Sequence, residues 1–280
     1  MMVGQTKRLI ELNKALENSN NLLIQNSNTP IISFTSGKGG TGKTFLCLNI
    51  AYQLARLQKK VLVVDFDINF SNVHIMLNTI PSETLYDFFT SKCLLDELIF
   101  KYNENLHFIF GYSGCEQKNI DCNRIRYFWN QLISISKNYD LVLIDTSSGA
   151  NVNILEILTL SDYNIVVANP EPTATLDAYA IIKLIDNSKK ENFIKIIINK
   201  YHKKDDALFA FGNLTKALEH FLKKKVSLLG YIPFDEGIAR SIMEQKLYLE
   251  NHTSGSPANR ILSIAEEFIN IKQVANNNHQ

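Results

Sequence analysis

A glycine-rich segment that follows a short apolar run and precedes an amphipathic one constrains this fold more than any other sequence feature. Residues 31–35 read I-I-S-F-T, residues 37–44 read G-K-G-G-T-G-K-T, and residues 45–57 have the apolar spacing of a helix. The middle segment is the G-x-x-x-x-G-K-[ST] pattern in the strand, loop and helix order that it requires. Its glycines let backbone N–H groups surround phosphate, and the helix N-terminus adds partial positive charge. We therefore expect a phosphate-binding loop here rather than a coincidental turn.

Short apolar runs alternate with helical patterns along the rest of the chain. We expect strands at residues 31–35, 61–65, 106–110, 141–145, 165–168, 194–199 and 226–232, and helices at residues 44–57, 124–136, 176–186 and 208–224. This alternation predicts an α/β fold, with a mainly parallel twisted sheet and helices on both faces. Ligands bind beyond the carboxyl ends of the strands in such sheets.

Composition limits the class of protein and its division into parts. The chain has 29 Lys and Arg against 28 Asp and Glu, so no excess of charge indicates nucleic acid or an anionic membrane as the main partner. Four cysteines without C-x-x-C spacing and no apolar run of about 20 residues favour a cytoplasmic protein with reduced thiols. We divide the chain into an N-terminal helix with an Asn-rich connector (1–28), a nucleotide-binding domain (29–272) and a polar tail (273–280).

The phosphate-loop pattern assigns roles to neighbouring polar residues. Lys43 is expected to reach the terminal phosphates and Thr44 to bind Mg²⁺. Asp145 ends the apolar run 141–144 and is the candidate for a second magnesium ligand, the alternative being an aspartate that only caps a strand. Thr146 follows it where many ATPases have a glutamate, so Asp65 and Asp67 are the remaining candidates for handling the attacking water.

The base can be argued from the segment after the run 194–198. GTPases commonly hold guanine with N-K-x-D, whereas residues 199–202 read N-K-Y-H, with a histidine at the position of the aspartate. This favours ATP over GTP. Asn199 is expected to contact adenine, the alternative being a loop asparagine that closes a turn.

Lys38 makes the loop K-G-G-x-G-K-T, and with it the chain resembles the MinD/ParA family from residue 30 onward. The resemblance implies an ATP-dependent dimer in which Lys38 reaches the partner's nucleotide. It further implies that Asp67 orients the attacking water, that Asp65 supports the magnesium shell, and that the backbone around Pro233 lies against adenine. The implied catalytic residues are Asp67, Lys38 and Lys43; the implied magnesium residues are Thr44, Asp65 and Asp145; and the implied ATP-binding residues are Gly37, Lys38, Gly39, Gly40, Thr41, Gly42, Lys43, Thr44, Phe45, Asn199, Pro233 and Asp235.

One branch of that family is indicated by the string P-E-P-T at residues 170–173 followed by D-A-Y at 177–179. It resembles the signature of flagellar-number regulators of the FlhG, FleN or YlxH type. The resemblance implies a cycle between an ATP-bound, membrane-associated dimer and a monomer, with flagellar basal-body components as partners. It also implies an N-terminal helix that activates the SRP-type GTPase FlhF, for which Gln5 is the candidate activating residue. The alternatives are a MinD- or ParA-like positioning ATPase and a weakly hydrolysing nucleotide-binding adaptor.

Two departures from the family pattern lie in the segment after Asp67. Asn69 stands where a glycine is common, and His74 stands where MinD-like proteins tend to have an aspartate. We expect hydrolysis to be tuned or weak as a result, although Asp67 itself is retained.

Two weaker signals concern surfaces. Ile261, Ile264, Ala265 and Phe268 form an apolar stripe that suits either a core helix or an amphipathic membrane anchor, and the neighbouring Glu266 and Glu267 favour the core. The Lys-rich runs around residues 200–204 and 223–225 are diluted by acidic residues such as Asp205, which favours a solvated surface over a DNA-binding one.

Overall fold

The fold is organised around one sheet of eight strands in the described part of the chain, in the order β3-β4-β2-β5-β1-β6-β7-β8. A computed structural model describes residues 28–67, 70–113, 120–186 and 193–277, and the side chains of these residues as far as residue 270. Gln5 and Asn69 lie outside the described residues, as does the predicted N-terminal helix. All neighbouring strands are parallel except β3 and β4, which are antiparallel.

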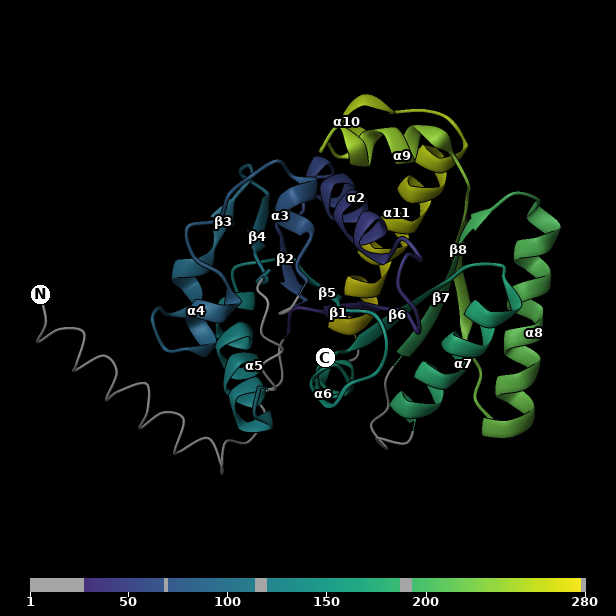
Figure 1. Ribbon diagram of the computed structural model, residues 1–280, viewed down its shortest axis with the longest axis horizontal. Helices are drawn as coiled ribbons and strands as arrows, with labels where there is room; N and C mark the ends of the chain where they lie inside the picture. Colours follow the sequence, from purple (N-terminus) through teal and green to yellow (C-terminus); the bar gives the residue numbers. More distant parts are fainter. Residues whose placement is uncertain (1–27, 68–69, 114–119, 187–192, 278–280) are drawn as a thin grey trace, which may run out of the picture.

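Helices cover both faces of the sheet (Figure 1). The strands are β1 (Ile31–Thr35), β2 (Val61–Phe66), β3 (Phe100–Lys101), β4 (Leu106–Ile109), β5 (Leu141–Thr146), β6 (Tyr163–Ala168), β7 (Phe193–Tyr201) and β8 (Ser227–Pro233). The helices are α2 (Lys43–Arg56), α3 (Val73–Met76), α4 (Leu85–Phe89), the 3₁₀ helix η2 (Leu95–Leu98), α5 (Cys122–Ser136), α6 (Val152–Leu160), α7 (Pro172–Asp186), α8 (Lys204–Leu222), α9 (Glu236–Met243), α10 (Tyr248–Asn251) and α11 (Ser256–Asn277).

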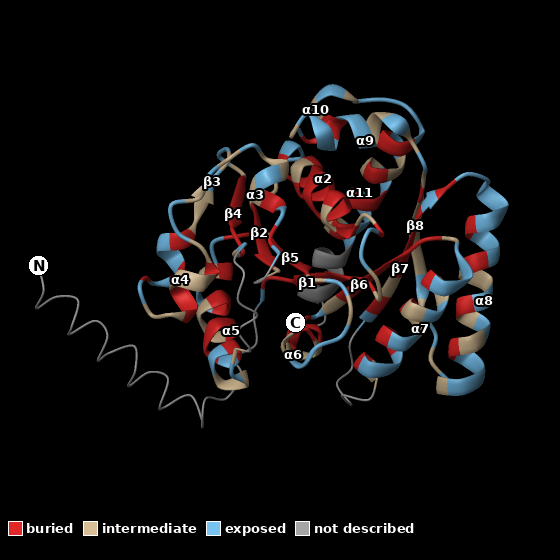
Figure 2. Ribbon diagram, viewed as in Figure 1, coloured by how far each residue is buried: buried red, intermediate tan, exposed pale blue. Residues whose placement is uncertain are grey.

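Alternation along each central strand explains why both faces are covered. In β2, Val61 and Val63 pack with α2 and α11, whereas Leu62 and Val64 pack with α4 and α5 on the opposite face. The side chains of a strand point to opposite faces in turn, so a strand that is apolar at every position is stable only between two layers. Each such side chain contributes about 1.5–3 kcal/mol when fully buried. Figure 2 shows the central strands buried along their length.

The predicted sheet and helices are confirmed, with shifts at their ends. α7 begins at Pro172, four residues before the predicted start at residue 176, because proline lacks an N–H group and fits the first turn of a helix. The short antiparallel strand β3 was not predicted, since two residues are too few to show a period. α11 continues to Asn277 and so includes five residues of the segment that was assigned to a polar tail.

The apolar stripe of α11 lies in the core. Ile261, Ile264, Ala265 and Phe268 are each at most 1% exposed, and Phe268 packs against Phe34 of β1 with ring centroids 6.0 Å apart. The core interpretation of this stripe is therefore confirmed. Among the residues that the structure describes, no helix has the length and hydropathy to cross a bilayer.

Candidate functional site

The loop between β1 and α2 ends at a helix N-terminus that no side chain caps. Gly42 is the N-cap residue, it makes no side-chain cap, and the first turn of α2 contains no acidic residue. The backbone N–H groups of a first helical turn have no partner within the helix and attract negative charge. The start of α2 is therefore built to bind an anion supplied from outside the chain.

Backbone conformation and a close neighbour both require glycine in this loop. Gly40 and Gly42 have positive φ angles of 75° and 90°. A Cβ atom on Gly42 would lie 2.2 Å from Nδ2 of Asn199. A larger residue at position 42 would therefore be strained and would collide with the end of β7.

The end of β7 fixes the loop through two hydrogen bonds. Nδ2 of Asn199 donates to the carbonyl oxygen of Thr41 at 2.7 Å, and Nζ of Lys200 donates to that of Gly40 at 2.7 Å. Asn199 is 3% exposed, so its bond replaces water that cannot reach the loop. The structure thus shows Asn199 shaping the phosphate loop, whereas its contact with adenine stays a prediction.

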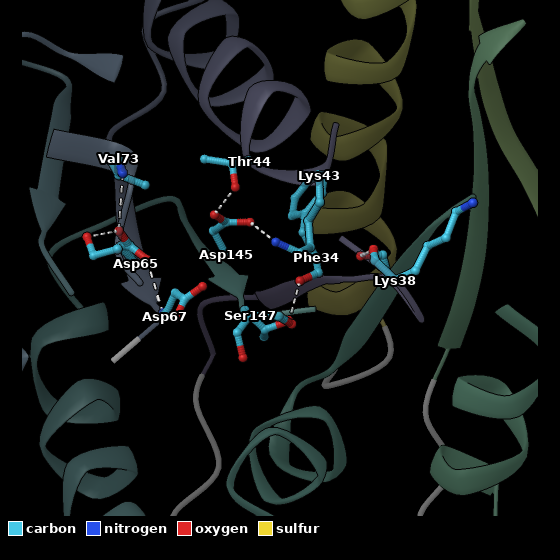
Figure 3. A network of polar contacts seen from close by, with 12 residues as sticks. Phe34, Lys38, Lys43, Thr44, Asp65, Asp67, Val73, Asp145 and Ser147 are labelled. Carbon is cyan, nitrogen blue, oxygen red and sulfur yellow. Dashed lines mark hydrogen bonds and ion pairs between the residues drawn. The ribbon is translucent and has the colours of Figure 1, made fainter. Parts of the chain in front are cut away.

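Strand register brings two aspartates together beside the loop. Asp65 at the end of β2 pairs in register with Asp145 at the end of β5, and Asp145 pairs with Phe34 of β1, just before the loop. Oδ2 of Asp145 accepts a hydrogen bond from Oγ1 of Thr44 at 2.6 Å, and Oδ1 accepts one from Nζ of Lys43 at 3.2 Å (Figure 3). The structure therefore brings together the predicted magnesium and phosphate groups.

Burial of these two carboxylates changes their acidity. Desolvation raises the pKa of Asp145, and the charge of Lys43 and the hydroxyl of Thr44 oppose that rise. Desolvation and the charge of Asp145 raise the pKa of Asp65 to about 7, against a hydrogen bond from Oγ of Ser71. Two buried carboxylates on neighbouring strands repel each other unless a cation lies near them.

The donor set fits Mg²⁺. This ion prefers hard oxygen ligands and is bound in nucleotide sites through one or two carboxylates together with substrate phosphates. The hydroxyl of Thr44 and the carboxylate of Asp145 are already in contact, and the carboxyl group of Asp65 lies on the neighbouring strand in register with Asp145. Oδ2 of Asp65 also accepts from the backbone N–H of Val73 at 3.4 Å, which ties α3 to the same cluster.

Asp67 follows directly after β2 and lies beside Asp65. Its backbone N–H donates to Oδ1 of Asp65 at 3.1 Å, and its own Oδ1 accepts from the backbone N–H of Phe70 at 3.0 Å. It lines the cavity above the phosphate loop and is partly exposed. The carboxylate therefore reaches the space in which a nucleotide and its attacking water would lie.

The cavity itself has a volume of about 400 Å³, within the range of small-molecule sites. The phosphate loop forms one part of its wall and the segment from Pro233 to Ile242 another. Asp235 lines it and also caps α9 by accepting from the N–H of Gly237 at 2.8 Å. Its lining residues are Ser36, Gly39, Gly40, Thr41, Gly42, Lys43, Thr44, Phe45, Asp67, Asn72, Met76, Ser148, Asn199, Lys200, Pro233, Phe234, Asp235, Ile238, Ala239 and Ile242.

The loop after β5 is bound to the strand that precedes the phosphate loop. Oγ1 of Thr146 donates to the carbonyl oxygen of Phe34 at 2.9 Å, and the N–H of Gly149 donates to that of Ser36 at 2.9 Å. The hydroxyl of Thr146 thus connects the end of β5 to β1.

Gly37 and Lys38 stand apart from the other loop residues because neither lines the cavity. Gly37 packs against α7, where an added Cβ atom would lie 2.4 Å from the carbonyl oxygen of Asp177. Nζ of Lys38 donates to Oε2 of Glu171 at 2.6 Å. This ion pair was not predicted from the sequence. Both partners belong to family signatures, but 133 positions separate them, and neither signature specifies a contact with the other.

Comparison with known proteins places this site in a family. Residues 29–199 match the family described as AAA domain. The chain is 28% identical over 222 residues to the antiactivator FleN of Pseudomonas aeruginosa, covering 79% of each protein. It is 28% identical over 248 residues to the flagellum site-determining protein YlxH of Helicobacter pylori, covering 88% of this chain and 83% of that one.

Solved structures share the fold. The cell division ATPase MinD of Pyrococcus furiosus matches with a TM-score of 0.71 and 23% identity, covering 86% of this chain and 99% of that one. The septum site-determining protein MinD of Pyrococcus horikoshii, solved in complex with Mg-ADP, matches with a TM-score of 0.70 and 24% identity, covering 88% and 98%. At these identities the likeness establishes a common architecture.

Proposed function

The chain belongs to the AAA domain family and, within it, to the MinD/ParA group of P-loop ATPases, and from this premise we propose that it is an ATP-dependent dimerising switch that regulates flagellar number or placement. Hydrolysis of ATP to ADP and phosphate resets the switch. The main observation that supports this proposal is that Lys43, Thr44 and Asp67 line one cavity, whereas Lys38 points away from it. A site that lacks its second lysine in its own subunit is completed by a second copy of the chain.

Within one subunit the residues bind, orient and position. The start of α2 and Lys43 would hold the phosphates, and Thr44 with Asp145 would hold Mg²⁺, which would supply positive charge against the phosphates. Asp65 supports the metal site from the neighbouring strand. Asp67 accepts a hydrogen bond from the attacking water and so aligns it with the terminal phosphate.

The partner supplies the remaining positive charge. Lys38 of one subunit reaches the nucleotide of the other and stabilises the charge that develops in the transition state. In GTPases that use an arginine in this way, the added cation raises the rate of hydrolysis about 10³–10⁵-fold. Hydrolysis is therefore coupled to dimerisation, because a monomer lacks this group at its own nucleotide.

The proposed biological task rests on the two flagellar relatives and on the P-E-P-T string at residues 170–173. The proposed partners are flagellar basal-body components and an SRP-type GTPase of the FlhF kind, with the segment around Gln5 acting on the GTPase. Addition of a peptide of residues 1–20 to purified FlhF should raise its GTP hydrolysis. An unchanged rate would refute the role of Gln5.

The proposed location is the cytoplasm, with peripheral association at the inner face of the cell membrane. The buried stripe of α11 is engaged in the core, so lipid contact requires another surface. Cosedimentation of the protein with anionic vesicles, with ATP and without it, tests this membrane association directly. DNA binding is not part of the proposal.

The number of flagella on cells that lack the gene tests the function. We expect an altered number or position of flagella. Normal flagella with defects in division or plasmid segregation would instead support a positioning ATPase, the second candidate, which is favoured by the MinD names of the structural neighbours. A protein that binds ATP but does not hydrolyse it, alone or with its partner, would indicate an adaptor.

A further inference from the structure

The signature lysine of the phosphate loop is held within its own subunit. Nζ of Lys38 lies 2.6 Å from Oε2 of Glu171, which immediately precedes α7. Figure 3 shows the Lys38 side chain extending away from Lys43, Thr44 and Asp145. The group that the proposed function sends to the partner's nucleotide therefore has a counter-ion in its own chain.

The carboxylate of Glu171 is presented by a fixed segment. Proline stands on each side of it, at positions 170 and 172, and proline restricts the backbone of its own residue and of the residue before it. The carbonyl oxygen of Glu171 accepts the N–H of Thr175 at 3.1 Å, which ties it to the first turn of α7. α7 in turn packs directly on the phosphate loop at Gly37. The backbone positions of the two residues are thus held by packing, while their side chains stay at the surface.

The ion pair is suited to being exchanged. The side chains of Lys38 and Glu171 are 34% and 61% exposed, so water screens them and their attraction is small. The hydrogen bond and charge of Lys38 lower the pKa of Glu171, with a smaller contribution from Lys200, so the carboxylate stays ionised at neutral pH. A triphosphate carries more negative charge than one carboxylate and competes well for the same ammonium group.

We propose that Glu171 is a positioning residue for Lys38, holding the lysine in the monomer and releasing it when the ATP-bound dimer closes. This inference rests on the proposed function, because it assumes that Lys38 acts across a dimer. The ion pair must break when the dimer forms, so dimerisation is less favourable by the free energy of one exposed ion pair. In this proposal the P-E-P-T string acts at the nucleotide site, because its Glu171 holds Lys38 away from the partner's nucleotide.

The test is a double-mutant cycle on dimerisation. Glu171→Gln removes the charge and keeps the size of the side chain, and the monomer–dimer equilibrium is followed by sedimentation with Mg²⁺ and a non-hydrolysable ATP analogue. We expect the dimer dissociation constant to fall about two- to fivefold, the range of one exposed ion pair. In a Lys38→Ala background the same substitution should have no effect, and the conservative Glu171→Asp should lie closer to wild type.

The outcomes distinguish failure of the proposed dimer from failure of the role of Glu171. A wild-type chain that stays monomeric with the analogue would refute the proposed dimer, and this role with it. If Glu171→Gln leaves the dimer dissociation constant unchanged or raises it, the role of Glu171 alone is refuted. The same holds if the substitution changes that constant equally in the Lys38→Ala background. The monomer is checked independently: carbodiimide should couple Lys38 to Glu171 in nucleotide-free protein, as read by mass spectrometry, and absence of the coupled peptide would overturn the inference.

Discussion

Replacement of Gly37 by alanine tests how tightly α7 is packed on the phosphate loop. The added Cβ atom would lie 2.4 Å from both Cβ and the carbonyl oxygen of Asp177, and 2.5 Å from its carbonyl carbon. Unstrained contacts between such atoms begin at about 3.5 Å, so the loop and α7 must separate by about 1 Å. The obstructing atoms are mostly backbone, which cannot turn away as a flexible side chain would.

The expected cost is that of overpacking. Forcing an extra methyl group into a packed site costs about 1–3 kcal/mol, so we expect the free energy of unfolding to fall by about that amount. The φ angle of Gly37 is not positive, so backbone strain adds little to this cost. The same displacement should weaken nucleotide binding, because the shifted segment is continuous with the cavity wall at Gly39 and Gly40.

Urea unfolding provides the assay and the chain provides its own probe. Trp129 is the one tryptophan, and it is 2% exposed in α5, so its fluorescence reports loss of the core. Gly212→Ala is the matched control: it lies within α8 with no atom within 4 Å of the added Cβ, and should stabilise the protein by up to about 1 kcal/mol. A Gly37→Ala variant that unfolds within about 0.5 kcal/mol of wild type and binds nucleotide equally well would show that α7 is not packed tightly on the loop.

Two further predictions follow from the hydrogen bonds and acidity of the site. Asn199→Ala removes the buried donor to the Thr41 carbonyl oxygen and should lower the free energy of unfolding in urea by about 1–3 kcal/mol. Lys200→Met removes an exposed donor and should leave the free energy of unfolding within about 0.5 kcal/mol of wild type. Equal effects of the two substitutions would contradict the assigned roles. The pKa of Asp65 is raised from 3.8 to about 7 on folding, so the folded state keeps a proton that the unfolded chain releases. Without metal or nucleotide, the stability of wild type relative to Asp65→Asn should therefore be greatest below pH 4 and fall as the pH approaches 7; a difference that stays constant or grows would contradict this sign.

The sheet and the phosphate loop could be predicted because their signals are local. A fully buried parallel strand such as β2 is apolar at successive positions, and the glycines of the loop are required by backbone angles at Gly40 and Gly42. The aspartates at strand ends were also predictable, because parallel strands end at one edge and bring their last residues together. These features need no knowledge of how distant segments pack.

The remaining contacts depend on tertiary packing and could not be predicted. The bond from the amide of Asn199 to Thr41 joins residues 158 positions apart, and the motif around Asn199 does not specify it. The pairing of Lys38 with Glu171 likewise requires the position of α7 over the loop. A motif specifies which groups are present near a site. The packing of β7 and α7 against the loop decides which of them meet.

The central claim, that the ATP site is completed by Lys38 of a second subunit, is tested most directly by mixing two inactive variants. Lys38→Ala and Asp67→Ala should each bind ATP and hydrolyse it far more slowly than wild type. In a mixed dimer, the Lys38→Ala subunit keeps Asp67 and receives Lys38 from its partner, so one of the two sites is complete. An equimolar mixture should therefore recover about a quarter of the wild-type rate per subunit, since about half of the dimers are mixed. A mixture that forms mixed dimers but remains as inactive as its components would contradict the account.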